Sequence, residues 1–164
     1  MTPRPDLPQG LEHIVREHGR RLGGLERTKR GSPFPASAFA AQTVDTAAST
    51  TSTSFTTISG GPSVNVAVSD AGILVVGLSG ALKLNSGAGN AAVMAYDLSG
   101  PATQGPADDL GIRNDALTWI QASFVDVIIG LPAGTYTVAA RYKSIDGLTS
   151  FFANRRIWAL ALAL

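Results

Sequence analysis

The stretch that decides the fold is the end of the chain, WALALAL (158–164). Large and small side chains alternate there with a period of two, which is typical of a β-strand. Both faces of this strand are apolar, so neither is expected to face water. We expect the bulky face to fill the core of a β-sandwich. The small face, with Ala159, Ala161 and Ala163, is then expected to pack against neighbouring copies of the chain.

The composition points to an all-β class. Of 164 residues 18 are glycine and 15% are charged, which suits many strands and turns. Because cysteine is absent, disulfides and thiolate metal sites are excluded. Residues 1–30 hold seven Lys or Arg against four Asp or Glu, and residues 31–164 hold six against eight. A mildly acidic β-domain is a poor nucleic-acid binder, so we expect no nucleic-acid partner.

Targeting signals are not expected either. The first thirty residues lack the apolar core of a signal peptide. The longest apolar stretches, 71–82 and 157–164, are too short to span a bilayer. The sequence therefore predicts no signal peptide and no membrane span.

Residues 1–30 are predicted to form a short N-terminal α-helix with a narrow apolar stripe. Its members are spaced by three or four residues, close to a heptad seam: Leu11, Ile14, His18, Leu22 and Leu25. Such a helix is marginal alone, so we expect it to anchor the chain to other proteins or to copies of itself. The alternative is a helix that lies on its own β-domain.

Residues 31–54 are rich in Ser, Thr, Pro and Ala, and are predicted to be an extended linker. Phe34 and Phe39 are expected to pin this linker to a neighbouring surface. Together with the helix, residues 1–45 form the predicted anchoring segment, which we expect to order only against its partners.

Residues 55–164 carry alternating segments separated by turns. Val64, Val66 and Val68 are expected on one face of a strand at 63–68. The segment 135–142 alternates in the same way, with Tyr136 and Tyr142 inward. Eight or so strands at this spacing predict a β-sandwich or jelly roll.

Two runs in this domain carry a resemblance to a known family. LPAGTYTVAARY (131–142), followed by TSFFANRRIWAL (149–160), resembles the end of C1q/TNF-like jelly-roll domains of tailed-phage fibre, tail-tip and head-decoration proteins. AGILVVGLSG (71–80) is similar to the second strand of that family. The resemblance covers residues 55–164 and implies a homotrimer with the C-terminal strand near its three-fold axis. It also implies that the helix and linker attach the domain to a virion.

Few residues of the sequence could support catalysis. Residues 55–164 contain no His, Cys or Glu, which excludes a serine triad. His13 and His18 are five residues apart and do not share a helix face as metal ligands would. Asp108, Asp109 and Asp115 could hold Ca²⁺, but their spacing matches no standard calcium loop, and solvated acids are favoured.

Two further sets of residues leave alternatives open. Trp119, Tyr96 and Tyr142 could form a sugar-stacking platform, although core packing is the expected role of most aromatics. Only one of Arg155 and Arg156 can point inward on a strand. It is expected to meet an aspartate, Asp126 or Asp97, within the chain or across a subunit boundary. The alternative is that both arginines face solvent.

The sequence therefore predicts a non-enzymatic virion structural protein, located in the virion after assembly in the host cytoplasm. It would be a tail fibre or tail-tip component, or a capsid decoration or head-fibre protein. Ala159, Ala161, Ala163 and Arg155 are its predicted trimer interface, and no catalytic residue, cofactor or metal is expected. The alternative is a carbohydrate-binding adhesin module that recognises host cell-surface glycans.

Overall fold

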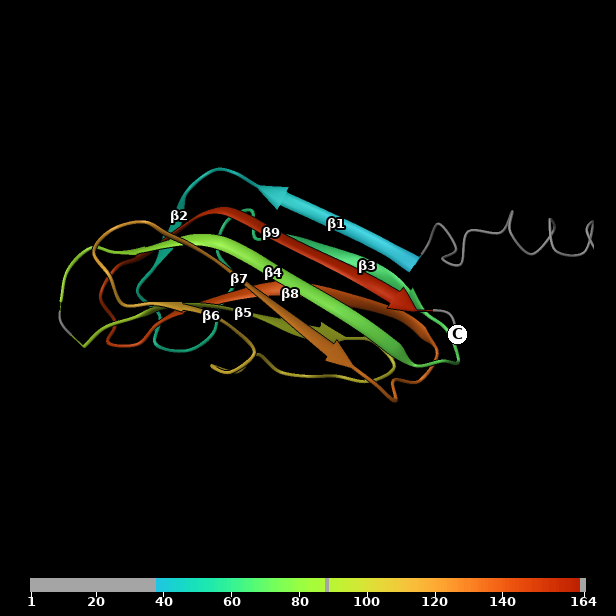
Figure 1. Cartoon of the computed structure of the whole chain (residues 1–164). Coiled ribbons are helices and arrows are strands. Elements are labelled where there is room, and N and C mark those ends of the chain that lie inside the picture. The colour runs from blue at the N-terminus through green and yellow to red at the C-terminus, as the bar shows by residue number, and fades with distance from the viewer. Residues whose placement is uncertain (1–37, 88, 163–164) are drawn as a thin grey trace, which may run out of the picture. The chain divides into compact units, whose positions relative to one another are not determined.

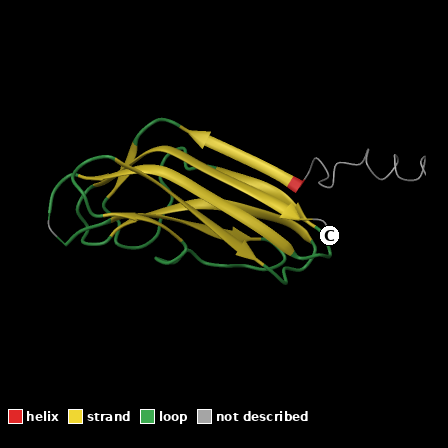
Figure 2. Cartoon of the chain, in the orientation of Figure 1, coloured by secondary structure: helices red, strands yellow, loops and turns green. Residues whose placement is uncertain are grey.

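The chain folds as an all-β sandwich, shown in Figure 1. The computed structural model describes residues 38–87 and 89–162. Figure 2 shows that strands joined by loops make up this part of the chain, apart from one short helical piece directly before β1. The strands are β1 (Phe39–Val44), β2 (Ala48–Thr50), β3 (Ser63–Val68), β4 (Ile73–Leu84), β5 (Ala92–Ser99), β6 (Gly111–Asn114), β7 (Ile120–Ile128), β8 (Gly134–Ser144) and β9 (Ser150–Leu162). The predicted helix at 1–30 lies outside the described residues.

Two antiparallel sheets form the sandwich. The five-stranded sheet has the order β1-β9-β4-β7, with β2 also paired to β9. The four-stranded sheet has the order β3-β8-β5-β6. Most connections carry the chain from one sheet to the other, as in a jelly roll. The predicted fold class is thus confirmed for the described residues.

The core lies between the two sheets and follows the predicted alternation. Val64, Val66 and Val68 of β3 are buried, as are Tyr136 and Tyr142 of β8. The Tyr142 ring meets the Phe152 ring of β9 edge to face, with 4.9 Å between ring centroids. Such contacts between the sheets bury most of the large side chains and hold the layers together.

The sandwich begins earlier than the sequence indicates. Residues 39–44 and 48–50 lie inside the predicted linker, yet both segments are strands that pair with β9. Gln42 also reaches the other sheet, where its Oε1 accepts a hydrogen bond of 2.6 Å from the Ser63 amide. The described part of the 31–54 segment therefore belongs to the β-domain. Apolar and polar residues alternate only weakly in 39–44, because β1 is an edge strand that is stabilised mainly by its pairing with β9.

The described residues contain no helix that is both long and apolar enough to cross a membrane.

Candidate functional site

A β-bulge in β9 sets which of its side chains face the core. Between the pairs Ser79–Arg156 and Ala81–Ala153 the register shifts, so Asn154 and Arg155 lie opposite the single residue Gly80. Asn154 has a φ of 48°, a left-handed conformation that asparagine tolerates better than most residues. The extra residue exchanges the two faces of the strand beyond it.

The bulge reverses the predicted faces of the C-terminal strand. Ala159 and Ala161 are buried in the core, and so is Arg155. Trp158 and Leu160 point outward and are half-buried. The prediction that the alanines and Arg155 form a subunit interface is wrong for these three residues, because their side chains are enclosed within the chain itself. Ala163 lies outside the described residues.

The outer face of the five-stranded sheet is consequently apolar over much of its area. In register, Phe39 and Leu160 lie beside Val75 and Val127 in one row across the four long strands. The neighbouring positions that extend this row on the same face are Ala41, Ile73, Gly77, Val125, Trp158 and Leu162. We call these ten residues the apolar face. Toward the other end of the sheet it gives way to polar residues.

Trp158 lies flat against β4 because its neighbour there is a glycine. A Cβ on Gly77 would come within 1.9 Å of Trp158 Cε2 and within 2.2 Å of its Nε1. No other residue type leaves this space, so Gly77 permits the indole to lie close to the sheet. The ring therefore lies over Gly77 and does not project away from the sheet.

A groove of about 330 Å³ opens at the β1 side of the apolar face. Its lining comes from β1 and β9: Phe39, Ala41, Thr43, Arg156 and Trp158. Arg156 Nε donates a hydrogen bond of 3.0 Å to Thr43 Oγ1, which holds the guanidinium at the polar end of the groove. The groove thus combines an aromatic wall with one cation and one hydroxyl.

The opposite edge of this sheet is apolar and exposed. Of the eight large hydrophobic residues exposed in the described chain, six lie between 117 and 129, on or beside the edge strand β7. Val125 and Val127 are each 57% exposed and Ile129 is 73% exposed. The Val127 amide donates a 2.8 Å hydrogen bond to its neighbour Asp126 Oδ1, so this amide is not free to pair with another strand. This edge therefore exposes a row of apolar side chains, and the backbone amide at Val127 is already bonded.

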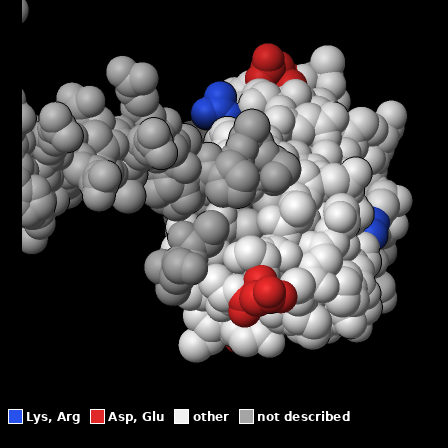
Figure 3. Space-filling view, turned by 90° about the vertical axis from the view of Figure 1, so that its right-hand side faces the viewer, with Lys and Arg blue, Asp and Glu red and all other residues white. Residues whose placement is uncertain are grey.

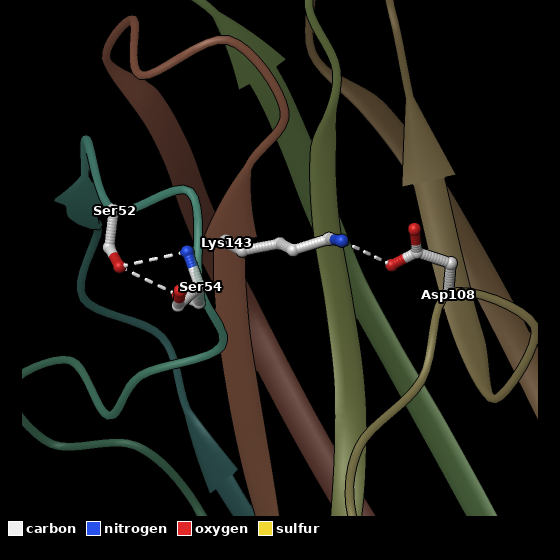
Figure 4. Close-up of polar contacts among 4 residues, drawn as sticks. All are labelled: Ser52, Ser54, Asp108 and Lys143. Atoms are coloured by element: carbon white, nitrogen blue, oxygen red, sulfur yellow. Dashed lines mark hydrogen bonds and ion pairs between the residues drawn. The ribbon is translucent and has the colours of Figure 1, made fainter.

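The outer face of the four-stranded sheet is polar by contrast. Arg141 and Asp97 form an ion pair there, with 2.6 Å between Nη2 and Oδ2. Figure 4 shows a second pair, in which Lys143 Nζ lies 2.6 Å from Asp108 Oδ1. Thr137 also donates a 2.7 Å hydrogen bond to Asn65. One outer face of the sandwich is therefore suited to water and the other is not.

At the end of the sandwich turned toward the viewer in Figure 3, charges are scattered over a largely uncharged surface. Charged side chains are therefore sparse on the visible part of this end, as expected for a chain with 15% charged residues.

Arg155 is the inward arginine, which confirms that only one of the pair points into the core. Its Nη2 donates a 2.9 Å hydrogen bond to the carbonyl of Thr46, and Nη1 donates one of 3.4 Å to that of Ser59. The guanidinium carbon lies 5.7 Å from the centroid of the Tyr142 ring, within cation–π range. Arg155 thus ties two loops near β1 and β2 to the core.

Neither predicted aspartate partners Arg155. Asp97 is engaged by Arg141. Asp126 Oδ2 accepts a short hydrogen bond of 2.5 Å from the Tyr96 hydroxyl. Burial, reinforced by this bond, raises the pKa of Tyr96. The prediction failed because the bulge turns Arg155 toward carbonyl groups that no sequence pattern marks.

The remaining predicted site residues separate in space. Asp108 is held by Lys143, while Asp109 and Asp115 are exposed. Within residues 38–87 and 89–162, no group of three or more His, Cys, Asp or Glu could hold a metal ion. Tyr96 and Tyr142 are buried and cannot stack on a sugar.

Of the predicted anchoring residues, Phe39 is on β1 and is 56% exposed at the groove. The others lie outside the described residues: Leu11, Ile14, His18, Leu22, Leu25 and Phe34. Sequence reasoning missed the groove itself, whose walls come from opposite ends of the β-domain. The one available signal was Gly77, which lies directly opposite Trp158 once β4 and β9 are paired.

The fold and this face define a β-sandwich module with one apolar outer face. Comparison with family models and with curated proteins gives no match. Among solved structures, the chain is similar to the CBM22-1 xylan-binding domain from Paenibacillus barcinonensis Xyn10C, at 15% identity over 79% of this chain and 90% of that one, with a TM-score of 0.38.

Two further solved structures show a likeness of the same order. The CBM22-1-CBM22-2 tandem domain from the same protein matches at 14% identity over 80% of this chain and 43% of that one, with a TM-score of 0.38. A Family 16 Carbohydrate Binding Module-2 matches at 13% identity over 75% and 72%, with a TM-score of 0.30.

Proposed function

We propose that this chain is a non-enzymatic structural protein whose β-domains associate with one another through the apolar face of the five-stranded sheet. The single observation that carries the proposal is the contrast between the two outer faces. One presents Phe39, Trp158, Leu160 and the exposed valines Val125 and Val127, and the other presents ion pairs. A contiguous apolar patch on a soluble module marks a surface that is covered in the assembled state.

The particular assembly we propose is the homotrimer implied by the resemblance to C1q/TNF-like domains, as part of a virion appendage. A tail fibre or tail-tip component and a capsid decoration or head fibre are both compatible with this role. The part of the predicted anchoring segment that precedes β1 would attach the trimer to other virion proteins, because residues 39–44 belong to the β-domain. Support for the virion comes from the segments 71–80, 131–142 and 149–160, whose sequences carry the resemblance.

Light scattering of the full chain tests the association. The wild type is expected at three times the monomer mass at micromolar concentration. Val125→Glu places a charge on the apolar face and should shift the population to monomers, because an unpaired charge is costly in a dry contact. Ala67→Glu, on the exposed outer side of β3, is the matched control and should remain trimeric. A wild type that stays monomeric contradicts the proposal.

The virion role has its own test. Purified particles produced by an infection that expresses this chain should contain it, detected by mass spectrometry. A chain lacking residues 1–30 should remain a folded trimer but be absent from the particles. Particles that incorporate the truncated chain as well as the intact one would overturn the anchoring role.

A second candidate function is glycan binding, which the groove beside Trp158 favours. The half-buried Trp158 indole, which lies flat on the sheet, suits the apolar face of a sugar ring, and Arg156 with Thr43 offers hydrogen-bond groups at one end of the groove. Isothermal titration calorimetry of the full chain with oligosaccharides from the host cell surface tests this candidate. Trp158→Ala should abolish binding, whereas Trp119→Ala, at an exposed indole outside the groove, should not.

The two candidates make opposite demands on the same surface. Self-association covers the apolar face, while sugar binding needs the groove open to solvent. A trimer that leaves Trp158 accessible to a quencher and binds glycan would favour the second.

A further inference from the structure

We infer that the groove at the β1 edge receives the exposed β7 edge of a second copy of this chain, so that each copy contributes a knob to one neighbour and a groove to another. This inference rests on the proposed self-association and specifies its contact. The knob is Val125, Val127 and Ile129. The groove is the set already defined, from Phe39 to Trp158.

The two edges of the five-stranded sheet differ in shape. On the β1 side the face is hollowed into a groove of about 330 Å³. On the β7 side, across β9 and β4, the side chains stand free, and Ile129 is 73% exposed. A groove and a row of free side chains on one continuous face are complementary shapes, and they belong to different edges. One copy cannot bring them together within itself.

The chemistry of the two surfaces also fits. The groove is walled by Phe39, Ala41 and Trp158, and its cation, Arg156, stays at one end, bonded to Thr43. Aliphatic side chains can fill the apolar part without covering a charge. An aromatic wall and small aliphatic groups pack well, and their burial releases water from both.

The one charged residue within the knob segment does not interfere. Asp126 turns inward from β7, where Oδ2 accepts the Tyr96 hydroxyl and Oδ1 accepts the Val127 amide. A copy docked on the outer side of β7 therefore meets no free carboxylate from this residue. The Val127 amide, at the centre of the knob, is already bonded, so the contact that we infer is made by the knob's side chains.

Knob-to-groove contact between copies has two closed forms. A pair of copies can exchange knobs about a two-fold axis, or each copy can bind the next around a ring. The trimer of the proposed function requires the ring, in which every knob and every groove is occupied. The number of copies that become covalently joined distinguishes the two forms.

Cross-linking is well suited to this test because the native chain has no cysteine. We would introduce Ala41→Cys in the groove together with Ile129→Cys in the knob, both at exposed positions where folding should not suffer. Disulfide formation needs Cα atoms about 4.4–6.8 Å apart, so a short bis-maleimide is used in parallel to accept a wider spacing. Thr43→Cys with Val127→Cys gives a second, independent pair.

The matched control replaces the groove position with Ala67→Cys and retains Ile129→Cys. Ala67 is an exposed alanine on β3, the edge strand of the other sheet. On a denaturing gel the groove–knob variants should give a covalent trimer. The control should remain monomeric under the same conditions.

Several outcomes would overturn the inference, and they differ from failure of the proposed function. A protein that light scattering shows to be trimeric, but that neither groove–knob pair cross-links, associates through another contact. A covalent product that stops at the dimer shows reciprocal exchange and not a ring. If the wild type is monomeric, the proposed self-association fails as well, and Trp158-dependent glycan binding becomes the remaining account of the groove.

Discussion

Replacement of Gly77 by alanine should reveal how strongly the flat position of Trp158 is built into the sandwich. The backbone of β4 accepts alanine here, since Gly77 has no left-handed φ. The new Cβ would nevertheless lie 1.9 Å from Trp158 Cε2, far inside van der Waals contact. The indole must swing away from the sheet, and overpacking of this kind costs about 1–3 kcal/mol of unfolding free energy.

The sign of the effect should reverse when the indole is removed. In a Trp158→Ala background the clash no longer exists. Alanine then has only its ordinary advantage over glycine in a strand, about 0.5–1 kcal/mol. The coupling between the two sites in a double-mutant cycle is therefore expected at about 2 kcal/mol, within the range for side chains in contact.

Urea unfolding followed by far-UV circular dichroism measures the four variants without relying on tryptophan fluorescence. All are compared at one protein concentration, because self-association stabilises the folded state by mass action. Gly105→Ala is the matched control: nothing lies within 4 Å of its added Cβ, and stability should hardly change. If Gly77→Ala has the same effect with and without the indole, the packing argument is refuted.

Three other perturbations follow from the core and the loops. Burial, the largest cause, raises the pKa of Tyr142 to about 12 from 10.0. The stabilising contribution of the neutral hydroxyl should therefore be full below pH 10 and be lost as pH rises through 12. In Tyr142→Phe the loss of unfolding free energy over this pH range, measured by circular dichroism, should be smaller by about 2–3 kcal/mol. Arg155→Lys should destabilise by about 1–3 kcal/mol in urea unfolding, because one ammonium replaces a fork that reaches the carbonyls of both Thr46 and Ser59; unchanged stability would show that these bonds contribute nothing. Asp108→Asn should cost less than about 1 kcal/mol, since this carboxylate forms a surface ion pair, and a chelator should leave the melting temperature unchanged; a drop of several degrees with chelator would indicate a metal at the loop.

Alternation in the sequence was sufficient to predict the sandwich. In the segments 63–68 and 135–142 every second residue is apolar, and those residues are the ones buried in the core. The signal is strong there because each strand has one wet face and one dry face. Strand β1 was missed because it carries no such contrast and depends on its pairing with β9.

The candidate site was harder to predict, because the choice of which face of β9 is buried depends on one residue. Both faces of 158–162 are apolar, so hydrophobicity alone does not say which one is inside. The bulge at Asn154 decides it, and asparagine in a strand is only a weak sign of a left-handed residue. The groove and the knob could not be predicted at all, because they depend on the order of strands in the sheet.

The bulge at Asn154 also bears on how this chain should be compared with others. A related strand with one residue fewer at this point would place its large and small side chains on the faces opposite to those seen here. A sequence alignment that places no gap at the bulge would pair Trp158 with a core residue of the related strand. It would likewise pair Ala159 with a surface residue of that strand. For this strand, the number of residues between Ala153 and Trp158 says more about which face is buried than the identities of those residues do.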